Sequence, residues 1–246
     1  VYAVGIYTLL AVSGLVPWSW GEWIESWMVY SHTDLWYVPA YLGLFLLSPF
    51  LNSMDFNKWI LAGFIAFNVW CGWLWHGSFN PTGYTVVQLV MMYLIGRYIS
   101  NHVNVEAGGH RLRYASLAAY LVCTALIVVM ALFADSLFTY AYNSPLVLVS
   151  SVALFLFFAS LDFSSKFVNR LAASAFAVYL VHKNPYIFGG LLKPLSLHVW
   201  ENTGLAEYTL FFVAFTIAIY FVIFFIDSVR AALFSIIGAA FKKTRA

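Results

Sequence analysis

The sequence predicts an all-α membrane protein, a polytopic transmembrane helical bundle with about eight spans in this chain. Composition is the first reason. Of the 246 residues, 63% are hydrophobic and 9% are charged, whereas a soluble domain carries about 25% charged residues. The second reason is that the apolar runs are continuous, without the alternation of barrel strands, so they predict helices.

Each predicted span is close to the ~17–25 residues that a helix needs to cross a hydrocarbon core. The spans are 1–16, 36–51, 59–75, 84–99, 115–134, 145–161, 171–188 and 209–228. No internal repeat and no long polar segment interrupts this pattern. Residues 1–246 are therefore expected to form a single domain.

The basic residues orient the spans, because most of the 12 Lys and Arg residues fall in every second gap between apolar runs. The positive-inside rule places those gaps in the cytoplasm. These residues are Lys58, Arg97, Arg111, Arg113, Lys166, Arg170, Arg230, Lys242, Lys243 and Arg245. The prediction is a multi-pass protein of the cell membrane with a cytoplasmic C-terminus, for which the lipid bilayer is the main partner. An oligomer is compatible with the sequence, and no basic stripe suggests nucleic acid.

Tryptophans gather at the expected outer boundary. Trp20, Trp23 and Trp27 share one face at helical spacing, so residues 20–30 are predicted to form a short helix on the outer surface. This stripe favours a membrane anchor, and stacking on sugar rings stays the alternative. Cys71 and Cys123 lie inside apolar runs, where a thiol behaves as a small hydrophobe, so neither a disulfide nor a metal site is predicted.

The strongest candidate for chemistry is at the outer end of the seventh span. Tyr179 and His182 are three residues apart on one helix face, and Lys183 and Asn184 follow. An ionisable group at that depth is costly unless it is partnered or faces water. His182 could serve as base or acid near neutral pH, while snorkelling of His182 and Lys183 to the interface is the alternative.

Two weaker candidates lie at the outer ends of other spans. His32 and Asp34 precede the second span and could form an oriented pair, and His76 and Asn80 close the third. Exposed loops often contain such residues.

Polar residues and prolines also occur within the apolar runs. Asn68 and Gln88 are expected to form interhelical hydrogen bonds. The two prolines of residues 36–52 predict a bent helix that either lines a cavity or only fits the packing.

The inner loop from Arg97 to Arg113 is rich in basic residues. Arg97, Arg111 and Arg113, with backbone amides near Gly108 and Gly109, suit the phosphates of an acyl-coenzyme A. The positive-inside rule by itself also accounts for basic residues here, and the pattern favours that simpler reading.

Four strings, in this order, resemble membrane acyltransferase family 3. They are WYVPAYLGLFLLSPFLN at 36–52, YTVVQLVMMYLIGRYIS at 84–100, YNSPLVLVSSVALFLFF at 142–158 and LAASAFAVYLVHKNPYI at 171–187. The resemblance implies transfer of an acyl group, usually acetyl, from cytoplasmic acyl-CoA to a hydroxyl of an extracytoplasmic polysaccharide or glycolipid, without a metal. Trp36, Tyr41 and Asn143, within these strings, join the outer residues named above as expected contacts of the acceptor.

The family's catalytic histidine, which follows a basic residue, and its Arg-x-x-Arg pattern belong to the N-terminal part and do not occur in this chain. The resemblance therefore implies that the chain lacks its N-terminal spans, that the principal histidine lies upstream of Val1, and that this polypeptide alone is inactive. Within the chain, His182 is the best catalytic candidate. A polysaccharide exporter or flippase without acyl transfer is the alternative function, and a bundle that only assembles with a partner membrane protein is a third.

Overall fold

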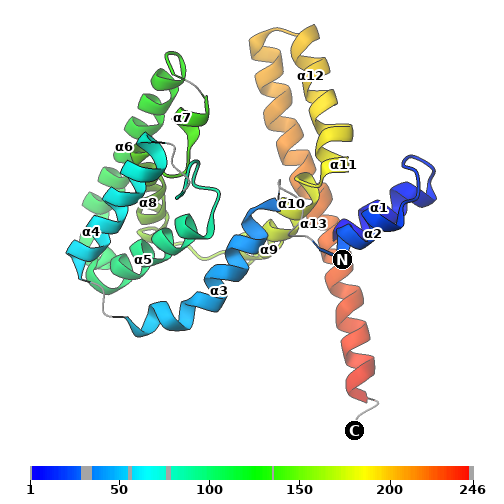
Figure 1. Ribbon diagram of the computed structural model, residues 1–246, viewed down its shortest axis with the longest axis horizontal. Helices are drawn as coiled ribbons and strands as arrows, with labels where there is room; N and C mark the ends of the chain where they lie inside the picture. Colours follow the sequence, from blue (N-terminus) through cyan, green and yellow to red (C-terminus); the bar gives the residue numbers. More distant parts are fainter. Residues whose placement is uncertain (1, 29–34, 55–56, 76–78, 135, 244–246) are drawn as a thin grey trace. The chain divides into compact units, whose positions relative to one another are not determined.

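Every secondary-structure element in the described part of the chain is a helix (Figure 1). This computed structural model describes residues 2–28, 35–54, 57–75, 79–134 and 136–243, with the side chains of 136, 137 and 239–243 left out. The chain forms two compact units, unit 1 (Val1–Leu35 and Ser164–Ala246) and unit 2 (Trp36–Phe163). The all-α prediction is confirmed for these residues, and the single domain stays a prediction.

Unit 2 is a group of packed apolar helices. Its elements are α3 (Tyr37–Ser53), α4 (Lys58–Phe67), the π-helix η3 (Asn68–Leu74), α5 (Val86–His102), α6 (Val105–Ala131), α7 (Ser136–Tyr140) and α8 (Pro145–Ala159). Helix α6 packs along α8, and α5 packs against α3 and α4. Leu51, Leu61 and Leu94 form a buried cluster where α3, α4 and α5 meet.

Two arginines show which way the helices of unit 2 run. Arg97, in the second half of α5, donates hydrogen bonds to backbone carbonyls at the C-terminal end of α3. Arg113, near the start of α6, donates to the carbonyl of Ser160 after α8, at 2.6 Å. Helices α3 and α5 are thus parallel, and α6 and α8 are antiparallel. These directions agree with the alternation that the charge pattern predicts.

The two prolines of α3 have different effects. Pro49 lies inside the helix and cannot donate to the carbonyl of Phe45, four residues earlier. The hydroxyl of Ser48 donates to that carbonyl instead, at 2.8 Å. Pro39 lies in the first turn, where the missing N–H costs no helical hydrogen bond, so it does not bend the helix.

Unit 1 combines the two ends of the chain. Its elements are α1 (Tyr2–Val12), α2 (Trp20–Trp27), α9 (Lys166–Ala173), α10 (Ala175–His182), α11 (Pro185–Ile187), the π-helix η4 (Phe188–Leu192), α12 (Lys193–Asn202) and α13 (Leu205–Lys243). Helix α10 packs against α1 and α13, and α12 packs against α13. Helix α2 confirms the short helix that the tryptophan spacing predicts, and Trp20 and Trp27 on it are exposed.

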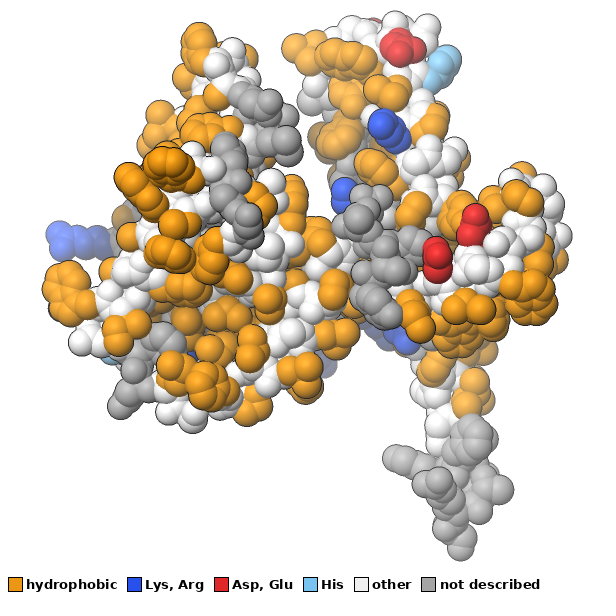
Figure 2. All heavy atoms as spheres, viewed as in Figure 1, with side chains coloured by type: hydrophobic (Ala, Val, Ile, Leu, Met, Phe, Trp, Pro, Cys, Tyr) orange, Lys and Arg blue, Asp and Glu red, His pale blue; other side chains and the backbone are white. Residues whose placement is uncertain are grey.

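Three helical segments are long and apolar enough to cross a membrane, among the residues that the structure describes. They are Val105–Ala131, Phe138–Ala159 and Leu205–Gly238, with shorter apolar helices at Tyr2–Val12 and Lys58–Leu74. Apolar side chains cover much of the visible surface (Figure 2), and many large ones are exposed, such as Leu210 and Phe225. Such exposure suits contact with lipid tails, so an integral membrane protein is supported. The sequence predicts about eight spans, whereas helix length alone supports three among the described residues.

Two predicted loops are wrong, because both segments are largely helical. Helix α5 continues to His102 and α6 begins at Val105, so most of the basic segment 97–113 is helix, with a kink at Gly109, where φ is +47°. The N–H of Gly108 bonds to the carbonyl of Asn104 at 3.2 Å and is not free to bind phosphate. The outer segment after residue 188 is likewise helical as far as Asn202. In both places, charged residues within a helical segment caused that segment to be predicted as a loop.

Candidate functional site

His182 is the last residue of α10 and is held in one orientation. Its Nδ1 lies 2.7 Å from the backbone carbonyl oxygen of Val178, one turn earlier. Because a carbonyl can only accept, Nδ1 must carry the proton. In the neutral ring the Nε2 atom is then a lone-pair acceptor, which is the form that a general base requires.

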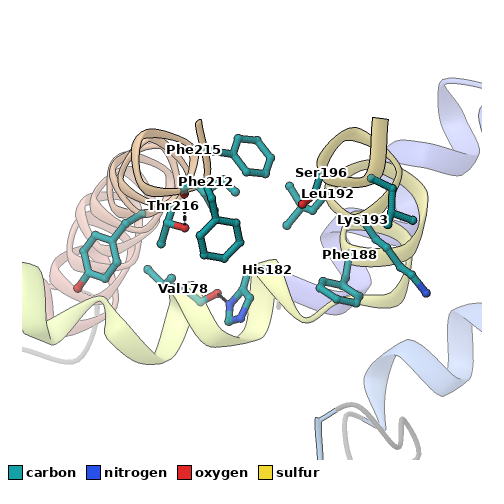
Figure 3. Close-up of a pocket in the computed structure, with 12 residues that line it drawn as sticks. Val178, His182, Phe188, Leu192, Lys193, Ser196, Phe212, Phe215 and Thr216 are labelled. Atoms are coloured by element: carbon teal, nitrogen blue, oxygen red, sulfur yellow. Dashed lines mark hydrogen bonds between the residues drawn. The ribbon is translucent and has the colours of Figure 1, made fainter. Parts of the chain in front are cut away.

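The ring of His182 forms part of the wall of a groove of about 460 Å³ within unit 1. Figure 3 shows it with Phe212 and Thr216 of α13 on one side and Phe188 and Leu192 of η4 on the other. The remaining lining residues are mostly apolar. The groove wall is therefore largely apolar, and hydrogen bonds and charges act more strongly where the surroundings hold little water.

The three residues predicted alongside His182 do not line this groove. The ring of Tyr179 packs edge-on against His182, with ring centres 6.2 Å apart. The ammonium of Lys183 lies 4.8 Å from the ring centre of Phe188, a cation–π contact. The buried side chain of Asn184 caps α11 by accepting from the N–H of Tyr186 at 3.1 Å. All three support the turn that follows His182.

A second polar centre lies inside unit 2 and consists of buried amides. Asn68 Nδ2 donates to Gln88 Oε1 at 3.1 Å, which confirms the predicted interhelical bond. Asn80 Nδ2 donates to Asn68 Oδ1 at 2.8 Å, and Asn143 Nδ2 donates to the backbone carbonyl of Asn80. Asn143 reaches that carbonyl where Gly72 has no side chain, since a Cβ there would lie 2.5 Å from Asn143 Nδ2. These four amides join three apolar segments of unit 2.

An aromatic cluster adjoins these amides. Trp36, Tyr84 and Tyr142 come from three separate chain segments, each just before a helix, and their ring centres are 4.9–5.7 Å apart. The structure thus brings the predicted residues Trp36 and Asn143 to the same end of unit 2. Tyr41 is one turn further along α3, where its ring stacks on Tyr37.

The three predicted donor-binding arginines have different surroundings. Arg97 bonds to the carbonyls of Met54 and Asn52 at 3.0 and 2.9 Å, and also to that of Leu51, so it caps α3. Arg113 in the same way bonds to the carbonyl that follows α8. Arg111 is exposed. Two of the three are therefore engaged in holding helix ends together, at the end of unit 2 opposite the aromatic cluster.

The predicted residues His32, Asp34 and His76 lie outside the described residues. Among the residues described, no group of three or more His, Cys, Asp and Glu side chains is arranged to hold a metal ion.

Asp227 is not among the residues predicted from the sequence, yet it is the centre of a buried cluster in unit 1. Asp227 is 5% exposed and accepts hydrogen bonds from Tyr2, Ser174 and Arg230. The salt bridge to Arg230 is 2.7 Å long. The sequence feature that could have revealed this cluster is the single carboxylate at the end of the apolar run 209–228.

Comparison with protein families decides the class of this protein. The family described as an acyltransferase domain, acyltransferase family 3, matches residues 1–227. The chain belongs to this family. Comparison with curated proteins and with solved structures gave no match.

The family match runs over both units and over every candidate residue named above. The acyltransferase therefore has a fixed imidazole in an apolar groove in unit 1 and, in unit 2, an aromatic end and an arginine-capped end. A general base, a water-poor site and binding groups for two substrates are what acyl transfer to a hydroxyl needs.

Proposed function

We propose that this membrane acyltransferase moves an acetyl group from cytoplasmic acetyl-CoA to a hydroxyl of an extracytoplasmic polysaccharide or glycolipid. The observation that carries the proposal is the hydrogen bond of His182, whose Nδ1 donates to the carbonyl of Val178 and leaves Nε2 as an acceptor, on a residue that lines an apolar groove.

In the proposed reaction, Nε2 of His182 takes the proton of the acceptor hydroxyl. The hydroxyl oxygen attacks the thioester carbonyl carbon, the C–S bond breaks, and the proton leaves with the coenzyme A thiol. The products are an O-acetyl ester and free coenzyme A, so no oxidant or metal takes part.

The two ends of unit 2 carry different residue types, and this difference supports the proposed orientation in the membrane. Arg97 and Arg113 lie at one end, and Trp36, Tyr84 and Tyr142 lie at the other. Basic residues favour the cytoplasmic side and Trp and Tyr favour the interface. We place the arginine end in the cytoplasm, where Arg111 meets the phosphates of the donor, and the aromatic end outside. The chain then has about eight spans, several of them short, in one acyltransferase domain.

The experiment replaces His182 and measures transfer of labelled acetyl from acetyl-CoA to membrane glycans. The expected N-terminal spans are supplied with the chain, because the family resemblance implies that residues 1–246 alone are inactive. His182→Ala and His182→Gln should both lower the rate by about 10²–10⁴-fold, as loss of a general base does. His198→Ala is the matched control, because His198 does not line the groove and its Nδ1 lies 3.4 Å from Nδ2 of Asn202 in its own helix. Equal transfer by His182→Ala and His198→Ala, at equal amounts in the membrane, would remove His182 from the reaction.

A further inference from the structure

The aromatic cluster of unit 2 is assembled by a close contact between two loops. Gly83 has φ +80°, and a Cβ at this position would lie 2.6 Å from Tyr142 Cβ. The N–H of Tyr142 donates to the carbonyl of Thr82 at 3.0 Å. The loop before α5 and the loop before α8 are therefore locked together, which places the rings of Tyr84 and Tyr142 edge to face, 4.9 Å apart.

Trp36 completes the cluster from the start of α3. Its ring centre lies 5.1 Å from that of Tyr84 and 5.7 Å from that of Tyr142. The side chains of Tyr84 and Tyr142 are 44% and 42% exposed. Aromatic surface thus remains open although the three rings contact one another.

Beside these rings is a pocket of about 250 Å³. Most of its wall is aromatic or aliphatic (Trp36, Tyr37, Leu89, Met92, Tyr142, Val147 and Leu148), and Gln88 and Ser151 are the polar residues that line it. Its wall is rigid because Gln88 Nε2 donates to the carbonyl of Tyr142 at 2.8 Å, and Gln88 Oε1 accepts from the buried amides of Asn68 and Asn80. The volume is below the ~300–1,000 Å³ of sites that enclose a whole drug-sized ligand. One small ring, rather than a long chain, suits this space.

The lining suits a sugar ring. The C–H groups on one face of a pyranose carry a slight positive charge and pack against the negative face of an aromatic ring. Its hydroxyls need polar neighbours, and two residues that carry a hydroxyl, Tyr142 and Ser151, line the pocket. The Ser151 hydroxyl donates to the carbonyl of Val147 at 2.7 Å and can still accept. The aromatic rings at the pocket, with hydroxyl-bearing residues beside them, are the features that favour a carbohydrate.

We propose that this aromatic pocket binds one pyranose ring of the glycan acceptor. The inference rests on the proposed function, since it names the part of the acceptor that unit 2 holds. Trp36 and Tyr142 contact the sugar in this proposal, and the amide network keeps their backbones in place.

The test measures direct binding and needs no catalysis. The full chain in lipid nanodiscs is mixed with methyl glycosides of glucose, galactose, mannose and N-acetylglucosamine, and saturation-transfer NMR records contact with the ring protons. We expect transfer to at least one glycoside, at least fivefold weaker for Trp36→Ala and largely kept by Trp36→Phe, which retains an aromatic face. Trp59→Ala is the matched control, because Trp59 is 72% exposed at the start of α4.

Each outcome bears on the proposal. Transfer that Trp36→Ala leaves unchanged, or an absence of transfer to all four glycosides, would overturn it, as would an equal loss in Trp59→Ala. Trp36→Phe separates misfolding from loss of stacking. If the Trp36→Phe protein is folded and loses all contact with the sugar, that result would also contradict the proposed stacking. Loss of acetyl transfer in His182→Ala with sugar contact intact would support the two sites separately. Sugar contact without transferase activity, in a protein supplied with the expected N-terminal spans, would defeat the proposed function alone.

Discussion

Ser174 donates a hydrogen bond of 2.7 Å to Asp227, and so ties the start of α10 to α13. The same carboxylate accepts from the guanidinium of Arg230 and from the phenol of Tyr2 on α1. One acidic side chain therefore joins three helices of unit 1. Because α10 begins after Ser174 and ends at His182, this cluster anchors the opposite end of the helix that carries the imidazole.

Replacing Asp227 should destabilise unit 1. Asp227→Ala leaves Arg230 without its partner, and breaking a buried pair in this way costs about 3–5 kcal/mol. The loss should fall at the lower end, because the side chain of Arg230 is 36% exposed and can reach water. Asp227→Asn should cost less, since its amide oxygen still accepts from Ser174. Thermal unfolding in nanodiscs measures this, with Ser228→Ala as control, since that hydroxyl bonds only to Phe224 of its own helix. Equal midpoints for Asp227→Ala and Ser228→Ala would contradict the structural role.

Replacing Arg97 should loosen α3 from α5. A charged hydrogen bond contributes about 1.5–3 kcal/mol, and Arg97→Ala removes bonds to three carbonyls of one helix end. Arg97→Lys should recover part of the loss, because an ammonium keeps the charge but not the planar fork. The exposed Arg111→Ala should leave the unfolding midpoint unchanged and raise only the KM for acetyl-CoA. A lower midpoint for Arg111→Ala with an unchanged KM would count against a contact with the donor.

Gly83→Ala should destabilise unit 2, because an alanine at φ +80° is strained and its Cβ would overlap Tyr142. We expect a cost of about 1–3 kcal/mol, the range of strained backbone positions. Gly63→Ala is the control, since Gly63 lies in the interior of α4 with nothing within 4 Å of an added Cβ. That change should instead stabilise the helix by roughly 0.5–1 kcal/mol. The same sign for both variants, in denaturant or thermal unfolding, would disprove the packing argument.

The ring of His182 should exist mainly as the tautomer protonated at Nδ1. The carbonyl of Val178 accepts from that nitrogen and holds it in place. Nitrogen-15 chemical shifts of labelled histidine, assigned by comparison with His182→Gln, report which nitrogen carries the proton. A protonated Nε2 in the neutral ring would remove the argument that this residue is ready to act as a base.

Labelling of single cysteines tests the proposed topology. In a background with Cys71→Ala and Cys123→Ala, a membrane-impermeant maleimide added to intact cells should label Thr203→Cys, in the turn between α12 and α13. Ser164→Cys, before α9, should react only after the cells are opened. The reverse pattern would invert the orientation, and labelling of both from outside would contradict the alternation of spans.

The fold class and the helix directions could be predicted from the sequence because they depend on local properties. Continuous apolar runs demand helices, since backbone groups must be satisfied within lipid, and the arginines lie at one end of unit 2 as their alternation requires. The bond from Asn68 to Gln88 was also predictable, because two amides within apolar spans need partners. The resemblance to the acyltransferase family also rests on local features, because it depends on four short strings of sequence.

Helix ends and side-chain partners were decided by tertiary structure. Nothing near Arg97 in the sequence shows that it caps α3, because its carbonyl partners lie more than 40 residues away. Asp227 reads as a cytoplasmic charge until α1 and α10 bring Tyr2 and Ser174 beside it. The aromatic pocket likewise exists only because three loops meet where Gly83 lets two of them touch. The sequence by itself thus determined a helical membrane protein with a basic side, through hydrophobicity and charge, and its resemblance to the acyltransferase family, through four strings. The tertiary structure decided which side chains meet, because those contacts depend on packing between distant segments.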